Sequence, residues 1–138
     1  MAILSINPYL NFDGTAAKAI ELYERALGAK VEFIQRFGEV PDMPCPPELK
    51  DRVMHAQLRI GESHLMISDT PPGDTIVGTG NAYVAIHLND VADAAARFEA
   101  LAKGGQVTMP LAETFWAARF GILVDAFGTR WMFNCGPK

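Results

Sequence analysis

Three histidines, His55, His64 and His87, are the residues of this chain best suited to chemistry. An imidazole can act as a general base near neutral pH, and it is a common metal ligand. Each histidine falls in a run of alternating apolar and polar residues, on the polar side of the alternation. The three lie on different expected strands, so we favour hydrogen-bonded polar residues over a three-histidine metal site. His55 and His87 are the candidate general bases.

The two cysteines give little support for catalysis. Cys45 lies in a proline-rich segment and Cys135 near the C-terminus. Their spacing matches no zinc motif, and no neighbouring histidine would activate Cys45 as a nucleophile. We expect both to be free thiols.

Length and composition restrict the classes of function. The chain has 138 residues, of which 49% are hydrophobic and 20% charged, with a formal net charge of −4. Lysine and arginine are scattered, so we expect no nucleic-acid partner. No apolar run is long enough to span a membrane, and residues 1–8 lack the basic region of a signal peptide. We therefore expect no membrane association and a cytoplasmic location.

The periodicity of apolar residues predicts the same order of elements twice. Helices are predicted at 15–27, capped by Thr15 or Asp13 and ended by Gly28, and at 91–103, capped by Asp90. Strands are predicted at 4–12, 30–37, 53–60 and 63–69, and again at 82–88, 106–109, 119–125 and 130–135.

This order is βαβββ in both halves. Module 1 covers about residues 1–69, a Gly-, Pro- and Thr-rich linker covers 70–80, and module 2 covers 81–138. Each module is too small to bury a sheet alone, so we predict one α+β domain over 1–138. Its two βαβββ modules would form a curved mixed sheet, a cup, with the helices on the outer face.

Alternation along the strands separates an apolar face from a polar one. The apolar set should pack under the helices: Leu10, Phe12, Ala56, Leu58, Ile60, Leu65, Ile67, Val84, Ile86, Leu88, Trp131 and Phe133. The opposite set mixes polar, aromatic and methionine side chains: Asn7, Tyr9, Asn11, His55, Gln57, Arg59, His64, Met66, Ser68, Tyr83, His87, Arg130, Met132 and Asn134. This mixture favours the lining of a small-molecule cavity over the wet side of a sheet.

The double βαβββ repeat resembles the vicinal-oxygen-chelate superfamily, which includes glyoxalase I, bleomycin-resistance proteins and extradiol dioxygenases. Segments spread over nearly the whole chain resemble its PhnB-like branch: Pro8-Tyr-Leu-Asn-Phe12, Ala19-Ile-Glu-Leu-Tyr23, Leu27-Gly-Ala29, His55-Ala-Gln-Leu-Arg-Ile60, Leu65-Met-Ile-Ser-Asp69, Glu113-Thr-Phe-Trp116, Arg119-Phe-Gly121, and Asp125-Ala-Phe-Gly128 with Trp131.

The resemblance implies a homodimer in which each cup binds a small molecule. In the metalloenzymes of the superfamily, four inward side chains hold a divalent metal. The matching positions here are Asn7, Met66, Tyr83 and Met132. None of these is a good ligand for a hard divalent ion. We therefore expect no cofactor, and a divalent metal is disfavoured.

The Glu113-Thr-Phe-Trp116 segment has two interpretations. Phe115 and Trp116 either cover an open end of the sheet or form an aromatic wall of the cup, with Glu113 and Arg119 as its charged groups. The candidate ligand-binding residues are Asn7, Tyr9, His55, Met66, Tyr83, His87, Phe115, Trp116, Arg119 and Met132.

Three functions fit these features. The first is a metal-independent protein that binds an amphipathic or aromatic molecule. The second is a superfamily enzyme, a lyase, isomerase or dioxygenase, with an atypical metal site or with His55 or His87 as general base and Arg59 or Arg119 as anion partner. The third is a non-catalytic structural dimer. The poor metal ligands favour the first.

Overall fold

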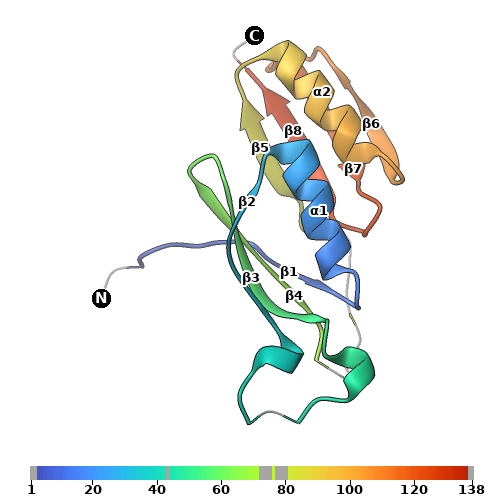
Figure 1. Ribbon diagram of the computed structural model, residues 1–138. Helices are drawn as coiled ribbons and strands as arrows, with labels where there is room; N and C mark the ends of the chain where they lie inside the picture. Colours follow the sequence, from blue (N-terminus) through green and yellow to red (C-terminus); the bar gives the residue numbers. More distant parts are fainter. Residues whose placement is uncertain (1–2, 43, 72–75, 77–80, 137–138) are drawn as a thin grey trace. The chain divides into compact units, whose positions relative to one another are not determined.

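The computed structural model describes residues 3–42, 44–71, 76 and 81–136 (Figure 1). The chain runs strand, helix, three strands in each half, as predicted. The first half holds β1 (Tyr9–Phe12), α1 (Ala16–Leu27), β2 (Lys30–Arg36), β3 (Val53–Ile60) and β4 (Ser63–Asp69), with two short 3-10 helices at Phe37–Glu39 and Pro47–Leu49. The second half holds β5 (Val84–Leu88), α2 (Val91–Ala102), β6 (Gln106–Ala112), β7 (Arg119–Val124) and β8 (Arg130–Cys135).

The strands form two four-stranded mixed sheets with the same topology. Their orders are β1-β4-β3-β2 and β5-β8-β7-β6. In each sheet the first strand pairs parallel with the last, and the other pairs are antiparallel. This confirms the α+β class and the two βαβββ modules.

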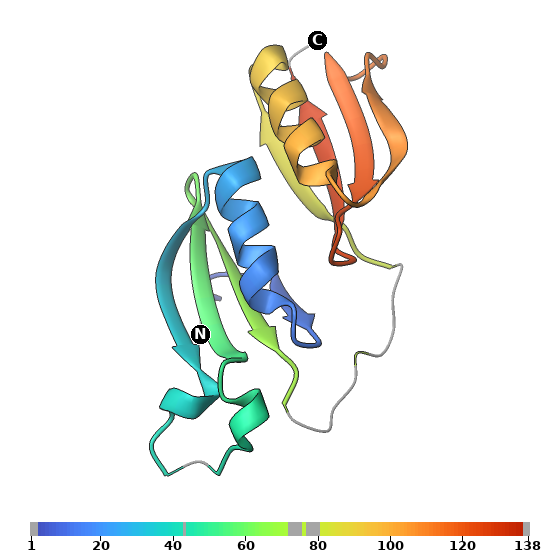
Figure 2. The ribbon, with the colours of Figure 1, turned by 45° about the vertical axis from the view of Figure 1, so that its right-hand side comes forward.

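The helix of each module lies across one face of its own sheet (Figure 2). The stripe predicted for α1 is confirmed, because Ala16, Ile20, Tyr23 and Leu27 are all buried. Gly28 ends α1 with a left-handed φ of 67°, which only glycine adopts at little cost. The strand expected at 4–12 begins only at Tyr9, so its first half was predicted wrongly.

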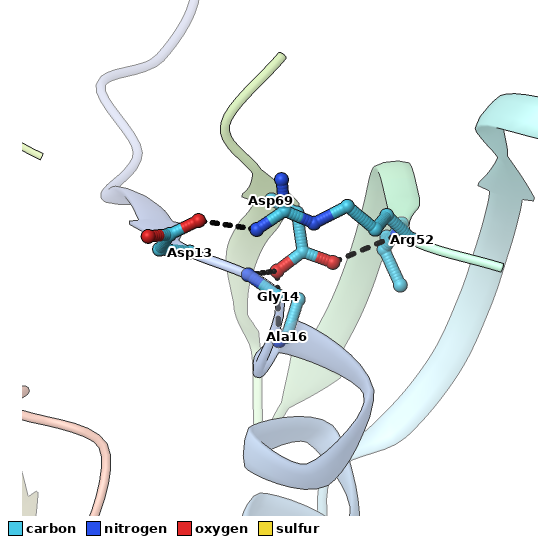
Figure 3. Close-up of polar contacts among 6 residues, drawn as sticks. Asp13, Gly14, Ala16, Arg52 and Asp69 are labelled. Atoms are coloured by element: carbon cyan, nitrogen blue, oxygen red, sulfur yellow. Dashed lines mark hydrogen bonds and ion pairs between the residues drawn. The ribbon is translucent and has the colours of Figure 1, made fainter. Parts of the chain in front are cut away.

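Asp69, at the end of β4, connects the start of α1 (Figure 3) with the start of β3 through side-chain hydrogen bonds. The residue is 2% exposed. One carboxylate oxygen accepts from the backbone N–H groups of Gly14 (2.8 Å) and Ala16 (3.0 Å), and the other accepts from Val53 N–H (2.9 Å). The cap predicted from Thr15 or Asp13 is wrong: Thr15 makes no side-chain cap bond, and Asp13 forms an ion pair with Arg52.

In module 2 the predicted cap is confirmed, because the Asp90 side chain accepts from Asp93 N–H at 2.9 Å. Phe98 of α2 packs edge-on against Phe133 of β8, with ring centroids 5.1 Å apart. Asp125 accepts from the indole N–H of Trp131 at 2.8 Å and thereby fixes the turn into β8.

Burial confirms the assignment of the sheet faces. In β3, β4 and β8 six of the residues expected under the helices are buried: Ala56, Leu58, Leu65, Ile67, Trp131 and Phe133. Val53 of β3 and Cys135 of β8 are buried as well. We call the opposite side of each sheet, turned away from its helix, the open face. The chain divides into two compact units, residues 1–24 with 28–77 and residues 25–27 with 78–138. Most of the linker predicted at 70–80 lies outside the described residues. No helix in the described ranges is long and apolar enough to cross a membrane.

Candidate functional site

The open face of module 2 is arranged in three rows across strands β5, β8 and β7. The central row places Met132 of β8 between Ala85 of β5 and Ile122 of β7. This row is apolar. It separates two polar rows that differ in chemistry.

The first outer row contains Arg130 of β8. Its guanidinium donates to the hydroxyl of Tyr83 at 2.7 Å and lies over the Tyr83 ring, 4.4 Å from its centroid. Val124 of β7 is its partner on the other side. The phenol thus holds the guanidinium by both a hydrogen bond and a cation–π contact.

The other outer row contains Asn134 of β8, flanked by His87 of β5 and Phe120 of β7. The Asn134 amide nitrogen lies 3.5 Å from His87 Nδ1. Asn134 Oδ1 is buried and has no hydrogen-bond partner in the described part of the chain. This end of the face therefore offers an amide and an exposed imidazole beside an aromatic ring.

An aromatic loop continues this second outer row. Trp116 packs edge-on against Phe120 with ring centroids 5.3 Å apart, and Phe115 packs against Trp116 at 4.7 Å. Thr114 and the buried Ala117 fix the loop by two mutual hydrogen bonds of 3.1 and 3.2 Å. Phe115 is nevertheless 85% exposed and Trp116 50% exposed. The loop thus presents two aromatic side chains instead of burying them.

The open face of module 1 has a different centre. The Tyr9 hydroxyl lies 2.7 Å from His55 Nδ1, and the rings of Tyr9 and Phe33 lie 5.5 and 5.8 Å from the imidazole. Met66 of β4 is the direct neighbour of Tyr9. Tyr9, His55 and Met66, all predicted site residues, therefore share one surface.

A charged cluster occupies the other end of this face. Glu32, at an irregularity of β2, accepts from Gln57 (3.3 Å) and Arg59 (3.2 Å) and pairs with His64 Nε2 at 3.2 Å. These contacts, the Gln57 hydrogen bond first and the charges of Arg59 and His64 after it, hold the pKa of Glu32 below its ordinary value of 4.5. His64 is thus committed to a carboxylate.

The strand register separates His55 from His64. Since Ala56 pairs with Ile67 and Arg59 with His64, the two histidines are four residues apart along the strands, or about 13 Å. They cannot ligate one ion together. In the described ranges no three His, Cys, Asp or Glu side chains converge in a way that could hold a metal.

The positions matched to the family's metal ligands carry the same poor donors as the sequence indicated. Asn7 precedes β1 and donates to Ser5 Oγ at 3.0 Å. Met66 lies in β4 and Met132 in β8, each on the open face of its module. Tyr83 precedes β5 and is engaged by Arg130. A neutral amide, two thioethers and a phenol do not fit a hard divalent cation.

The placement of three residues of module 2 differs from the predicted set. Arg119 shares the alternation of Gly121 and Leu123, on the side of α2, so the structure does not bring it to the open face with His87. Phe120 and Arg130 are on that face and were not among the predicted site residues. Strand alternation already placed Arg130 there, but nothing in the sequence showed that it would lie over Tyr83.

Comparison with known proteins agrees with this architecture. Residues 5–133 match the model of the Glyoxalase/Bleomycin resistance protein/Dioxygenase superfamily. Protein YjdN of Escherichia coli K12 is 34% identical over 140 residues, covering 95% of each chain. The crystal structure of protein PA1353 from Pseudomonas aeruginosa is 40% identical, with a TM-score of 0.88 over 99% of this chain and 100% of that one.

A more distant structure shares the fold. The PhnB protein from Bacillus cereus is 22% identical, with a TM-score of 0.80 over 96% of this chain and 99% of that chain. The resemblance noted in the sequence is therefore confirmed, and the chain belongs to the glyoxalase/bleomycin-resistance/dioxygenase superfamily.

Proposed function

We propose that this protein binds a small amphipathic or aromatic molecule without the metal used by the enzymes of its superfamily. One observation carries the proposal. On the open face of module 2, Trp116 packs edge-on against Phe120, which lies in the same row as Asn134 and His87, so an aromatic wall adjoins two hydrogen-bonding groups. Apolar surface with a few placed polar groups is typical of small-molecule sites.

The state of the aromatic loop supports this function. An exposed tryptophan on a loop fixed by its own hydrogen bonds loses little conformational freedom when a ligand stacks on it. If Phe115 and Trp116 served only to cover the end of the sheet, we would expect them to be largely buried. Their exposure favours a role as an aromatic wall of a binding site over a role as a cover for the end of the sheet.

Trp116 also provides the assay. The chain has two tryptophans, and Trp131 is 1% exposed in the core, so the indole N–H resonances of the two residues report on different environments. The neutral probe ω-phenylheptanamide, added to chelator-treated protein, should shift the Trp116 resonance and leave that of Trp131 in place.

Trp116→Ala lacks this resonance, so its affinity is measured by calorimetry. The substitution should weaken binding of this probe about tenfold, the effect of losing about 1–2 kcal/mol of stacking. Val91→Ala, at an exposed apolar position on α2, is the control and should not change the affinity. Equal affinities in wild type and Trp116→Ala, with unchanged circular dichroism, would exclude the loop as a binding wall.

A second candidate, an enzyme that uses a general base, rests on the pair Tyr9–His55. A phenol bonded to Nδ1 fixes the orientation of the imidazole, and if Nδ1 carries the proton, Nε2 is left free as a base. The pair lacks an electrophile to stabilise an enolate, so binding is the better-supported function. Turnover that Tyr9→Phe and His55→Gln abolish would favour the enzyme.

We further propose that the protein acts as a cytoplasmic homodimer. β2 and β6 are outer strands of their sheets and carry exposed apolar side chains, Val31 and Phe33 on β2 and Val107 and Met109 on β6. Outer strands with apolar side chains are prone to association, and a second copy of the chain would cover them.

A further inference from the structure

We propose that the natural ligand is an amphipathic carboxylate whose anionic end binds Arg130 and whose apolar end reaches the aromatic wall of Trp116 and Phe120. This inference rests on the proposed function, because it assigns a ligand class to the same open face of module 2. It adds Arg130, which is not one of the residues matched to the metal ligands of the superfamily.

Arg130 is a cation that no carboxylate neutralises within the described ranges. Its partner is Tyr83, which accepts one hydrogen bond and offers the face of its ring. Neither contact cancels the charge, and the remaining guanidinium N–H groups find no protein acceptor among the described residues. By contrast, Arg52, Arg59 and Arg97 all pair with acidic side chains.

The contact with Tyr83 also fixes the geometry of the cation. The ring and the hydroxyl of this one phenol together restrict a side chain that would otherwise lose much rotamer freedom on binding. A guanidinium held in this way presents its N–H groups as a fork, which matches the two oxygens of a carboxylate.

The register of β8 sets the length of the ligand. Arg130, Met132 and Asn134 lie on one face of the same strand, so the cation and the row of Phe120 are four residues apart, or about 13 Å. The row between them, Ala85, Met132 and Ile122, is apolar throughout. A molecule lying along β8 therefore meets a cation, an apolar floor and an aromatic wall in turn.

The charge of the ligand is limited as well. No second lysine or arginine is on the three rows, and the whole chain carries a formal net charge of −4. One guanidinium balances one negative charge, whereas a dianionic phosphate would leave excess charge over apolar surface. A monocarboxylate is the class that the arrangement fits.

The test compares ω-phenylheptanoate, its neutral amide and the shorter phenylpropanoate, titrated into the full chain and followed by the Trp116 indole resonance and by calorimetry. The extended heptanoate is comparable in length to the separation of the two ends. Arg130→Gln is the test variant. Arg119→Gln removes the same charge from a strand residue on the α2 side and is the matched control.

We expect wild type to bind the heptanoate about tenfold more tightly than its amide, the size of one charge-assisted contact at a half-buried site. Arg130→Gln should remove this preference and leave the amide affinity unchanged, whereas Arg119→Gln should keep the preference. Phenylpropanoate, too short to reach both ends, should bind more weakly than the heptanoate and should not shift Trp116 and the Arg130 side-chain resonances together.

Each contrary result has a distinct meaning. If the acid and the amide bind equally, or if Arg130→Gln keeps the preference, the carboxylate assignment is wrong while the binding function stands. If Arg119→Gln removes the preference as well, the effect is one of overall charge and the assignment is again wrong. If no probe shifts Trp116, both the assignment and the proposed function fail.

Discussion

Asp69→Ala tests the physical account of how module 1 is assembled. The carboxylate of Asp69 joins two segments that are distant in sequence. It accepts from Gly14 and Ala16 at the start of α1 (Figure 3) and from Val53 at the start of β3. Ala16 and Val53 are buried, so alanine at position 69 would leave two backbone N–H groups without an acceptor and away from water.

The magnitude follows from these two groups. A buried donor that loses its acceptor costs about 1–3 kcal/mol, so the loss of two should lower the free energy of unfolding of Asp69→Ala by about 2–6 kcal/mol. Asp69→Asn keeps one accepting oxygen but turns an amide N–H toward a backbone N–H. It should cost about 1.5–3 kcal/mol, because one hydrogen bond to a charged group is lost.

Asp13→Asn is the matched control, since it is the same substitution in the same region. Asp13 pairs with Arg52, but its side chain is largely exposed, and such ion pairs contribute less than about 1 kcal/mol. Urea denaturation followed by circular dichroism measures all three variants. If Asp69→Ala is no less stable than Asp13→Asn, the Asp69 carboxylate does not stabilise module 1 through its three hydrogen bonds.

Three further predictions concern other parts of the chain. The pKa of Glu32 is lowered in the folded state, so its contacts stabilise the fold at pH values above the ordinary pKa of 4.5, and this contribution is lost as the pH falls through the lowered pKa. Glu32→Gln should therefore be less stable than wild type near neutrality. Urea titrations should show the free energies of unfolding of the two proteins converging in acid. Sedimentation equilibrium at micromolar concentration should give twice the 15.0 kDa of one chain, and Phe33→Asp on the outer strand β2 should shift the mass toward the monomer; a monomeric wild type would contradict the dimer. Gly121→Ala should lower the free energy of unfolding by about 1–3 kcal/mol, because its methyl group would lie 2.9 Å from the Leu111 backbone and 3.0 Å from the Phe98 ring. An unchanged urea midpoint would show that β6 and α2 shift at little cost to make room for the methyl group.

Local chemistry explains which parts of the fold the sequence could predict. Gly28 and Asp90 end and begin helices through contacts within a few residues, and both roles were readable from the chain. The cap of α1 was not, because its acceptor is Asp69, 53 residues away from Ala16 in sequence. Thr15 had the residue type and position typical of an N-cap, but the acceptor for the first turn of the helix is the distant carboxylate of Asp69.

The site shows the same limit. Alternation placed His55, Met66 and Met132 on the open faces because the period of a strand depends only on the strand itself. Arg119 was grouped with the aromatic loop that precedes it. A shift of one residue in the alternation along β7 would move its side chain to the other face of the sheet. The pairing of Arg130 with Tyr83 joins residues 47 apart and follows only from the register of β5 and β8.

Native mass spectrometry of protein purified without chelator, combined with elemental analysis, tests the central claim most directly. The four positions matched to the family's metal ligands, Asn7, Met66, Tyr83 and Met132, carry no carboxylate or imidazole. The protein should therefore retain no stoichiometric divalent ion, and chelator treatment should leave the affinity for ω-phenylheptanamide unchanged. One tightly held zinc, nickel, manganese or iron ion per chain, with binding lost on its removal, would contradict the account and favour a metalloenzyme.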